Sequence, residues 1–100
     1  MDERQEELFS KTIELLKEME QAFADEKVSI TKFYRDSEPV QILDKETTLV
    51  MLMFLKLNIA EITEAEVRWF YDQGDVDFIY TIKYKALGSD LVLQVEVQKT

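Results

Sequence analysis

Cysteine and histidine are both absent from this sequence of 100 residues. Without cysteine the chain has no disulfide, no thiolate metal ligand and no cysteine nucleophile. Without histidine it lacks the side chain that most often acts as a general base near neutral pH, the commonest zinc ligand and the usual activator of a serine nucleophile. We therefore expect a protein that is not an enzyme and that holds neither a metal ion nor a cofactor.

Glycine and proline are scarce, with two glycines and one proline in the chain. Two glycines are too few for a loop that cradles phosphate, and neither the GxGxxG nor the GxxxxGK pattern occurs. Asp72, Asp75 and Asp77 surround Gly74, and carboxylate oxygens are the ligands that Mg²⁺ and Ca²⁺ prefer. Their spacing lacks the order and the distal glutamate of an EF-hand loop, so an ordinary turn is the favoured interpretation.

Long hydrophobic runs are missing as well. The longest, residues 49–55, has seven residues, whereas about 20 are needed to cross a bilayer. Residues 1–7 are acidic and polar, unlike a secretory signal or an arginine-rich transit peptide. No repeat and no linker-like tract divides the chain. We expect a cytoplasmic protein with one domain over residues 1–100.

Negative charge is in excess, because 21 acidic side chains stand against 12 basic ones and the net charge is −9. Residues 1–26 hold nine acids and three bases, and residues 61–77 hold six acids and one base. Nearly all of the excess therefore lies in these two segments. Such a surface repels anionic membranes and nucleic acid, and it attracts basic proteins through interactions that salt weakens.

The first half of the chain predicts a helix followed by a hairpin. Over residues 3–24 apolar side chains recur every three or four residues, which is typical of an amphipathic helix. Residues 28–31 and 40–43 alternate with a period of two on either side of a turn at 36–39. We expect two short paired strands, with Pro39 at a strand start, where the missing amide hydrogen is tolerated.

Two segments in the middle of the chain are ambiguous. Residues 47–59 begin with an apolar run that fits a buried strand or a buried helix, and the β-branched start and later alternation favour a strand. In residues 63–74 a capping-box pattern and a glycine favour a helix, whereas the aromatic residues within 67–71 favour a strand. We predict strands in both segments, with a second short helix near 64–73 as the alternative.

The carboxyl end gives the clearest pattern. Residues 78–85 and 91–98 alternate on either side of a turn at 88–90, which predicts an antiparallel hairpin. Lysine and glutamine on one face indicate that this face meets water, so the N-terminal helix should cover the aromatic and aliphatic face. The predicted fold class is α+β: a long N-terminal amphipathic helix packed on an antiparallel sheet of about four to six strands.

Aromatic residues cluster in the last third of the chain, and some of them must point outward. Trp69 and Tyr71 share one face of a predicted strand, and exposed aromatic side chains anchor protein interfaces. We combine them with the acids of 61–77 as the candidate partner-binding set. Its members are Glu61, Glu64, Glu66, Asp72, Asp75, Asp77, Trp69 and Tyr71.

The leading hypothesis is a non-catalytic acidic protein-binding module that engages a basic protein. Surfaces of this charge occur on inhibitors and decoys that mimic DNA or another nucleic acid, of the phage or mobile-element type. They also occur on immunity proteins, which cover a basic cleft. The alternative is a structural, assembly or chaperone-like subunit that forms a homodimer or larger homo-oligomer through an aromatic sheet face. In that case the acids only solubilise the protein. The acids of the predicted N-terminal helix either present carboxylates to a basic partner or only keep the protein soluble. They are Glu3, Glu6, Glu7, Glu14, Glu18 and Glu20.

Overall fold

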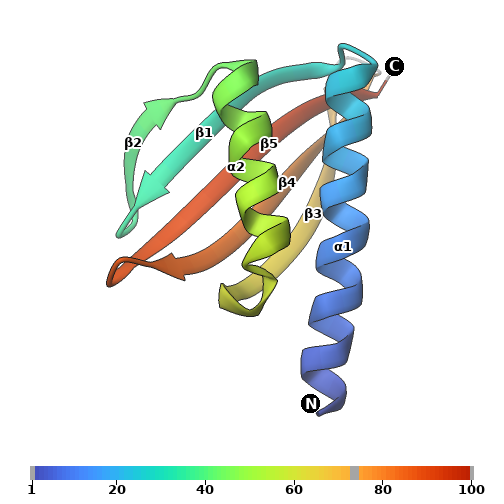
Figure 1. Ribbon diagram of the computed structural model, residues 1–100. Coiled ribbons are helices and arrows are strands. Elements are labelled where there is room, and N and C mark those ends of the chain that lie inside the picture. Colours follow the sequence, from blue (N-terminus) through green and yellow to red (C-terminus); the bar gives the residue numbers. More distant parts are fainter. Residues whose placement is uncertain (1, 73–74, 100) are drawn as a thin grey trace.

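Two helices cover one face of a five-stranded antiparallel sheet (Figure 1), which confirms the predicted α+β fold class. The computed structural model describes residues 2–72 and 75–99. The strand order across the sheet is β2-β1-β5-β4-β3, so β2 and β3 form its two edges. The elements are α1 (Glu3–Ala24), β1 (Val28–Arg35), β2 (Glu38–Ile42), α2 (Lys45–Leu57), the 3₁₀ turn η1 (Ile59–Glu61), β3 (Ile62–Asp72), β4 (Asp75–Ala86) and β5 (Ser89–Lys99).

Helix α1 has the bounds that its apolar periodicity predicts. Asp2 caps the start of the helix with a capping box. Its side chain accepts a hydrogen bond from the Gln5 amide at 2.9 Å, and the Gln5 side chain accepts one from the Asp2 amide. The side chains buried against the sheet recur every three or four residues, as in Leu15, Leu16 and Met19. The first turns of α1 extend beyond the end of the sheet (Figure 1), which leaves them exposed.

Helix α2 corrects the strand predicted over residues 47–59. Asp44 caps the helix, because its Oδ1 accepts a hydrogen bond from the Thr47 amide at 2.7 Å. Thr48, Leu52 and Leu55 are buried at spacings of four and three residues, the periodicity of a helix. The strand prediction was wrong because the short apolar run hid this periodicity, and the alternation after it falls on the helix end and η1.

Strand β3 confirms the strand predicted from residue 63 onward, while Gln73 and Gly74 lie outside the described residues. The alternative helix near 64–73 is wrong: the second helix is α2. β3 pairs with β4 along its length, with Val67 opposite Tyr80 and Trp69 opposite Phe78. Cross-strand packing of aromatic and β-branched side chains outweighed the local capping signal.

Both predicted hairpins are present. β1 and β2 join through Asp36 and Ser37, which adopt positive φ angles of 49° and 71°. β4 and β5 join through Leu87 and Gly88, with φ angles of 53° and 76°. Two successive positive φ angles give a turn whose twist matches that of the strands.

The core lies between the sheet and the helices, as the alternation of the last two strands predicts. Tyr80, Ile82 and Tyr84 of β4 are buried on the face that the helices cover, together with Leu93 and Val95 of β5. The opposite face of the sheet has no helix over it among the described elements (Figure 1). Within the described residues, no helix is long and apolar enough to span a membrane.

Candidate interaction surface

The fold separates the eight predicted partner-binding residues. Glu61 lies in η1, at one end of β3, and Asp77 lies in β4 near the other end of that strand. The backbones of Asp72 and Asp75 are paired across β3 and β4, but their side chains lie outside the described structure. The set therefore follows the whole length of β3 and does not form one compact cluster.

Two of these acids are neutralised by neighbouring cations. An oxygen of Glu64 lies 3.2 Å from Lys83 Nζ, and an oxygen of Glu66 lies 3.2 Å from Arg68 Nη2. Both pairs are partly exposed, so each contributes little to stability. Their effect on recognition is larger, because a carboxylate that already has a cation attracts a basic partner less.

The two predicted aromatic residues do come together. Trp69 and Tyr71 pack edge to face with their ring centroids 5.2 Å apart. They remain 61% and 67% exposed, so they are not part of the hydrophobic core. Side chains alternate along a strand, and Ala65, which has the same parity, is buried. Trp69 and Tyr71 therefore lie on the face of β3 that α1 packs against.

Helix α2 carries an exposed apolar stripe that the sequence analysis missed. Val50, Met53, Phe54 and Leu57 follow one another at helical spacing and are 66%, 64%, 45% and 83% exposed. The other side of α2 is buried in the core. A helix that is apolar all round is normally buried all round. Had the run at 49–55 been assigned to a helix, its surplus of apolar residues would have indicated this stripe.

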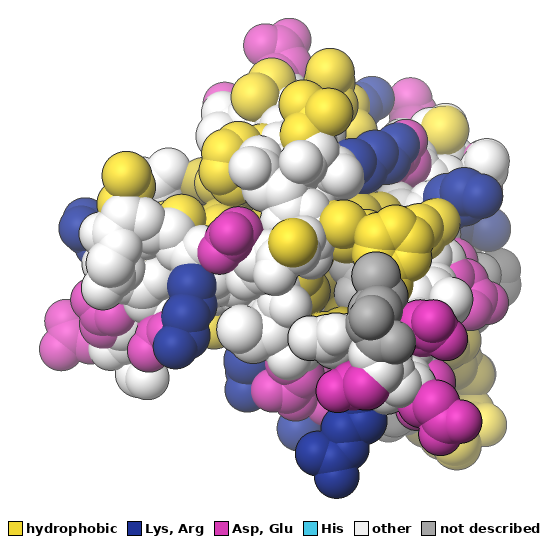
Figure 2. Space-filling view, turned by 60° about the horizontal axis from the view of Figure 1, so that its bottom comes forward, with side chains coloured by type: hydrophobic (Ala, Val, Ile, Leu, Met, Phe, Trp, Pro, Cys, Tyr) yellow, Lys and Arg dark blue, Asp and Glu magenta, His cyan; other side chains and the backbone are white. Residues whose placement is uncertain are grey.

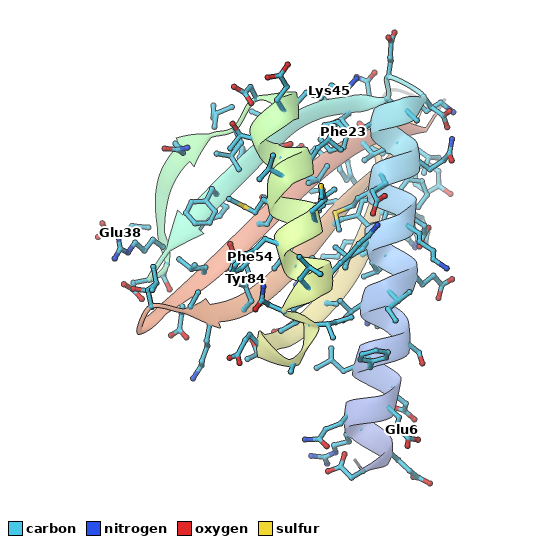
Figure 3. The ribbon with its side chains drawn as sticks, in the orientation of Figure 1. Glu6, Phe23, Glu38, Lys45, Phe54 and Tyr84 are labelled. Carbon is cyan, nitrogen blue, oxygen red and sulfur yellow. The ribbon has the colours of Figure 1, made fainter. Side chains whose placement is uncertain are left out.

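Phe54 connects the stripe to the core. Its ring lies 6.5 Å from the ring of buried Tyr84 in a tilted arrangement, beside α2 (Figure 3). The contact fixes one edge of the stripe on the sheet, whereas Met53 and Leu57 have most of their surface in water. The stripe is therefore held in place without being covered.

A hollow of about 520 Å³ opens where α1 extends past the sheet. Ile59 and Ala60 of η1 form one side of it, two residues after Leu57 ends the stripe. Leu8 and Phe9 of α1 form the other side, and Phe9 is 40% exposed. In Figure 2 the lower end of the molecule is turned forward, and hydrophobic and acidic side chains lie side by side on this surface.

The exposed side of α1 carries carboxylates that form no salt bridge in the described structure. Glu3, Glu6, Glu7 and Glu14 are exposed and line a shallow surface together with Lys11. Within the described part of the chain, no salt bridge engages these four glutamates. Four carboxylates that form no salt bridge with the described residues thus lie on the exposed side of α1, next to the hollow.

The remaining acids of α1 serve the fold. Glu20 forms an ion pair with Lys56, which links α1 to α2. Glu18 accepts a hydrogen bond from the buried Tyr80 hydroxyl at 3.3 Å. Burial and the neighbouring Glu18 carboxylate raise the pKa of Tyr80 to about 12.

The described residues include no group of three or more acidic side chains placed to hold a metal ion. What the surface offers is an apolar stripe, an apolar hollow and a row of carboxylates on adjacent helices. A scan of known protein families, a search of curated proteins and a search of solved structures found no match to the chain.

Proposed function

We propose that this chain is a non-catalytic protein-binding module that engages a basic protein through its layer of helices. The observation that carries the proposal is the exposed stripe of Val50, Met53, Phe54 and Leu57 on α2. Contiguous exposed apolar side chains on a folded domain mark interaction sites. Fully burying a side chain of this size is worth about 1.5–3 kcal/mol, so a few of them suffice to anchor a partner.

The charge on α1 supports a basic partner. α1 and α2 pack against each other on the same face of the sheet (Figure 1), so a protein seated on the stripe also meets the carboxylates of α1. Glu6, Glu7 and Glu14 form no salt bridge among the described residues, although Lys11 lies on the same surface. They are free to attract lysine and arginine, which speeds association and selects the partner. An inhibitor or decoy that covers a basic surface is the form of this function that we favour.

The first test combines capture from cell extract with two sets of substitutions. One variant carries Val50→Ser, Met53→Ser and Leu57→Ser, and the other carries Glu6→Lys, Glu7→Lys and Glu14→Lys. We expect the wild-type chain to retain a basic protein that both variants lose. Capture should also weaken as salt rises, because screening shortens the range of the α1 charges.

The control is Leu87→Ser, which changes a side chain that is 99% exposed in the β4–β5 turn. It removes exposed apolar surface away from the helices and should leave capture unchanged. Retention of an acidic protein, or of a basic one by all variants at every salt concentration, would contradict the proposal.

A further inference from the structure

The two edges of the sheet differ in how far they are protected from pairing with another strand. β2 is a short edge strand with Pro39 in it, and the β1–β2 pair contains a bulge between Phe33 and Tyr34. Short length, proline and bulges are features that block pairing with a foreign strand. β3 is the opposite edge; it has 11 residues and no proline, and its register with β4 shifts only near its start, between Ile62 and Glu64.

We propose that a second copy of this chain pairs with β3 along this open edge, so that two five-stranded sheets join into one. The contact is antiparallel and has twofold symmetry, because the same strand supplies both sides. This inference concerns the edge of the sheet and stands independently of the partner proposed for the helices.

The sequence of β3 selects a single register for this contact. Residues directly opposite each other in an antiparallel pair lie on the same face of the sheet. The twofold axis must therefore pass midway between a residue and the same residue of the second copy. Placing Val67 opposite Val67 of the second copy pairs the regular part of the strand from Glu64 to Phe70, beyond the register shift near Ile62. The same register places Glu66 opposite Arg68 of the second copy, twice by symmetry.

Neighbouring registers bring like charges together. An axis through Glu66 places this carboxylate opposite the Glu66 carboxylate of the second copy. An axis through Arg68 places two guanidinium groups opposite each other. Like charges directly opposite each other destabilise a pair of strands. The register centred on Val67 is therefore the one of these three in which the charges are complementary.

Two of the side chains that meet the second copy in the register centred on Val67, Arg68 and Trp69, are exposed in the single chain. Glu66 and Arg68 already form an ion pair within one chain, at 3.2 Å, and Arg68 is largely exposed. Two copies would bring these pairs together as a network of four alternating charges, which is worth more than an isolated surface pair. On the other face Trp69, which is 61% exposed, would lie opposite Ala65 of the second copy. The second copy would then cover part of the Trp69 ring.

Charge exchange tests the register. Sedimentation equilibrium over a concentration series reaching about 1 mM should show a dimer of the wild-type chain. Arg68→Glu should weaken it by at least about tenfold, since four carboxylates then meet at the seam. The double variant Glu66→Arg with Arg68→Glu should restore it. The matched control Lys85→Glu makes the same change of charge at an exposed position of β4 and should leave the dimer intact.

A cysteine probe tests the position of the axis, because the chain has no cysteine of its own. Val67→Cys should give a covalent dimer with a short bifunctional thiol reagent, whereas Trp69→Cys should not, since residue 69 faces residue 65. A wild-type chain that stays monomeric over the series would overturn the proposal. So would a dimer that Arg68→Glu leaves unchanged, or one that is lost in the Val50, Met53 and Leu57 serine variant and not in Arg68→Glu.

Discussion

At the scale of single residues, Tyr80 links the ionisation of a side chain to the stability of the fold. Its side chain is 2% exposed, and its hydroxyl donates to Glu18. Burial is the larger cause and the nearby Glu18 carboxylate the smaller one of a rise in the pKa of Tyr80 from 10.0 to about 12. The folded state therefore holds the phenolic proton more tightly than the unfolded state does, and ionisation favours unfolding.

The stability of the fold should therefore fall at alkaline pH. The stabilisation from Tyr80 is complete below pH 10.0 and is lost as the pH rises from 10.0 to about 12. In Tyr80→Phe the free energy of unfolding should fall less over this interval. Below it the substitution should cost no more than about 1 kcal/mol, because it removes one long hydrogen bond. Denaturant unfolding at a series of pH values measures both effects.

Tyr84 supplies the matched comparison. Burial also raises its pKa, so Tyr80→Phe should remove part of the alkaline loss of stability and Tyr84→Phe a further part. If the double variant lost stability over the same interval as steeply as the wild type, these two phenols would not be the groups responsible.

At the scale of elements, α2 has two apolar sides with opposite roles. Leu52 is 1% exposed in the core, and its neighbour Met53 is 64% exposed on the stripe. Leu52→Ala should lower the free energy of unfolding by about 2–5 kcal/mol through lost burial and a cavity. Met53→Ala should change it by no more than about 0.5 kcal/mol. Equal losses in chemical denaturation would show that the stripe belongs to the core.

The same helix shows where sequence patterns fail to specify an element. Residues 3–24 and the last two strands were predictable because one side of each is polar, which makes the periodicity visible. In α2 both sides are apolar over 49–55, so the helical period disappears and only the Asp44 cap remains as a signal. β3 was ambiguous for a different reason, because its capping-box pattern is local while its pairing with β4 is not.

At the scale of the whole molecule, the sequence located the negative charge but not its partners in space. Glu64 and Glu66 look like free acids in the chain, and only the folded sheet brings Lys83 beside Glu64. The carboxylates at the start of α1 form no salt bridge in the described structure, and these turns extend past the sheet and its cations (Figure 1). Ion pairs across strands depend on register, and no local pattern reveals them.

Net charge and the exposed stripe together control how the molecule associates as the pH changes. At pH 7 a net charge of −9 per chain opposes association through the helix surface, and this repulsion disappears as the pH falls towards the isoelectric point near 4.4. The stripe on α2 should then drive association, because apolar attraction does not depend on pH. Light scattering over a pH series should rise near 4.4 for the wild-type chain and for Leu87→Ser. It should rise much less for the variant with serine at Val50, Met53 and Leu57, and identical curves for all three proteins would show that another surface mediates the contact.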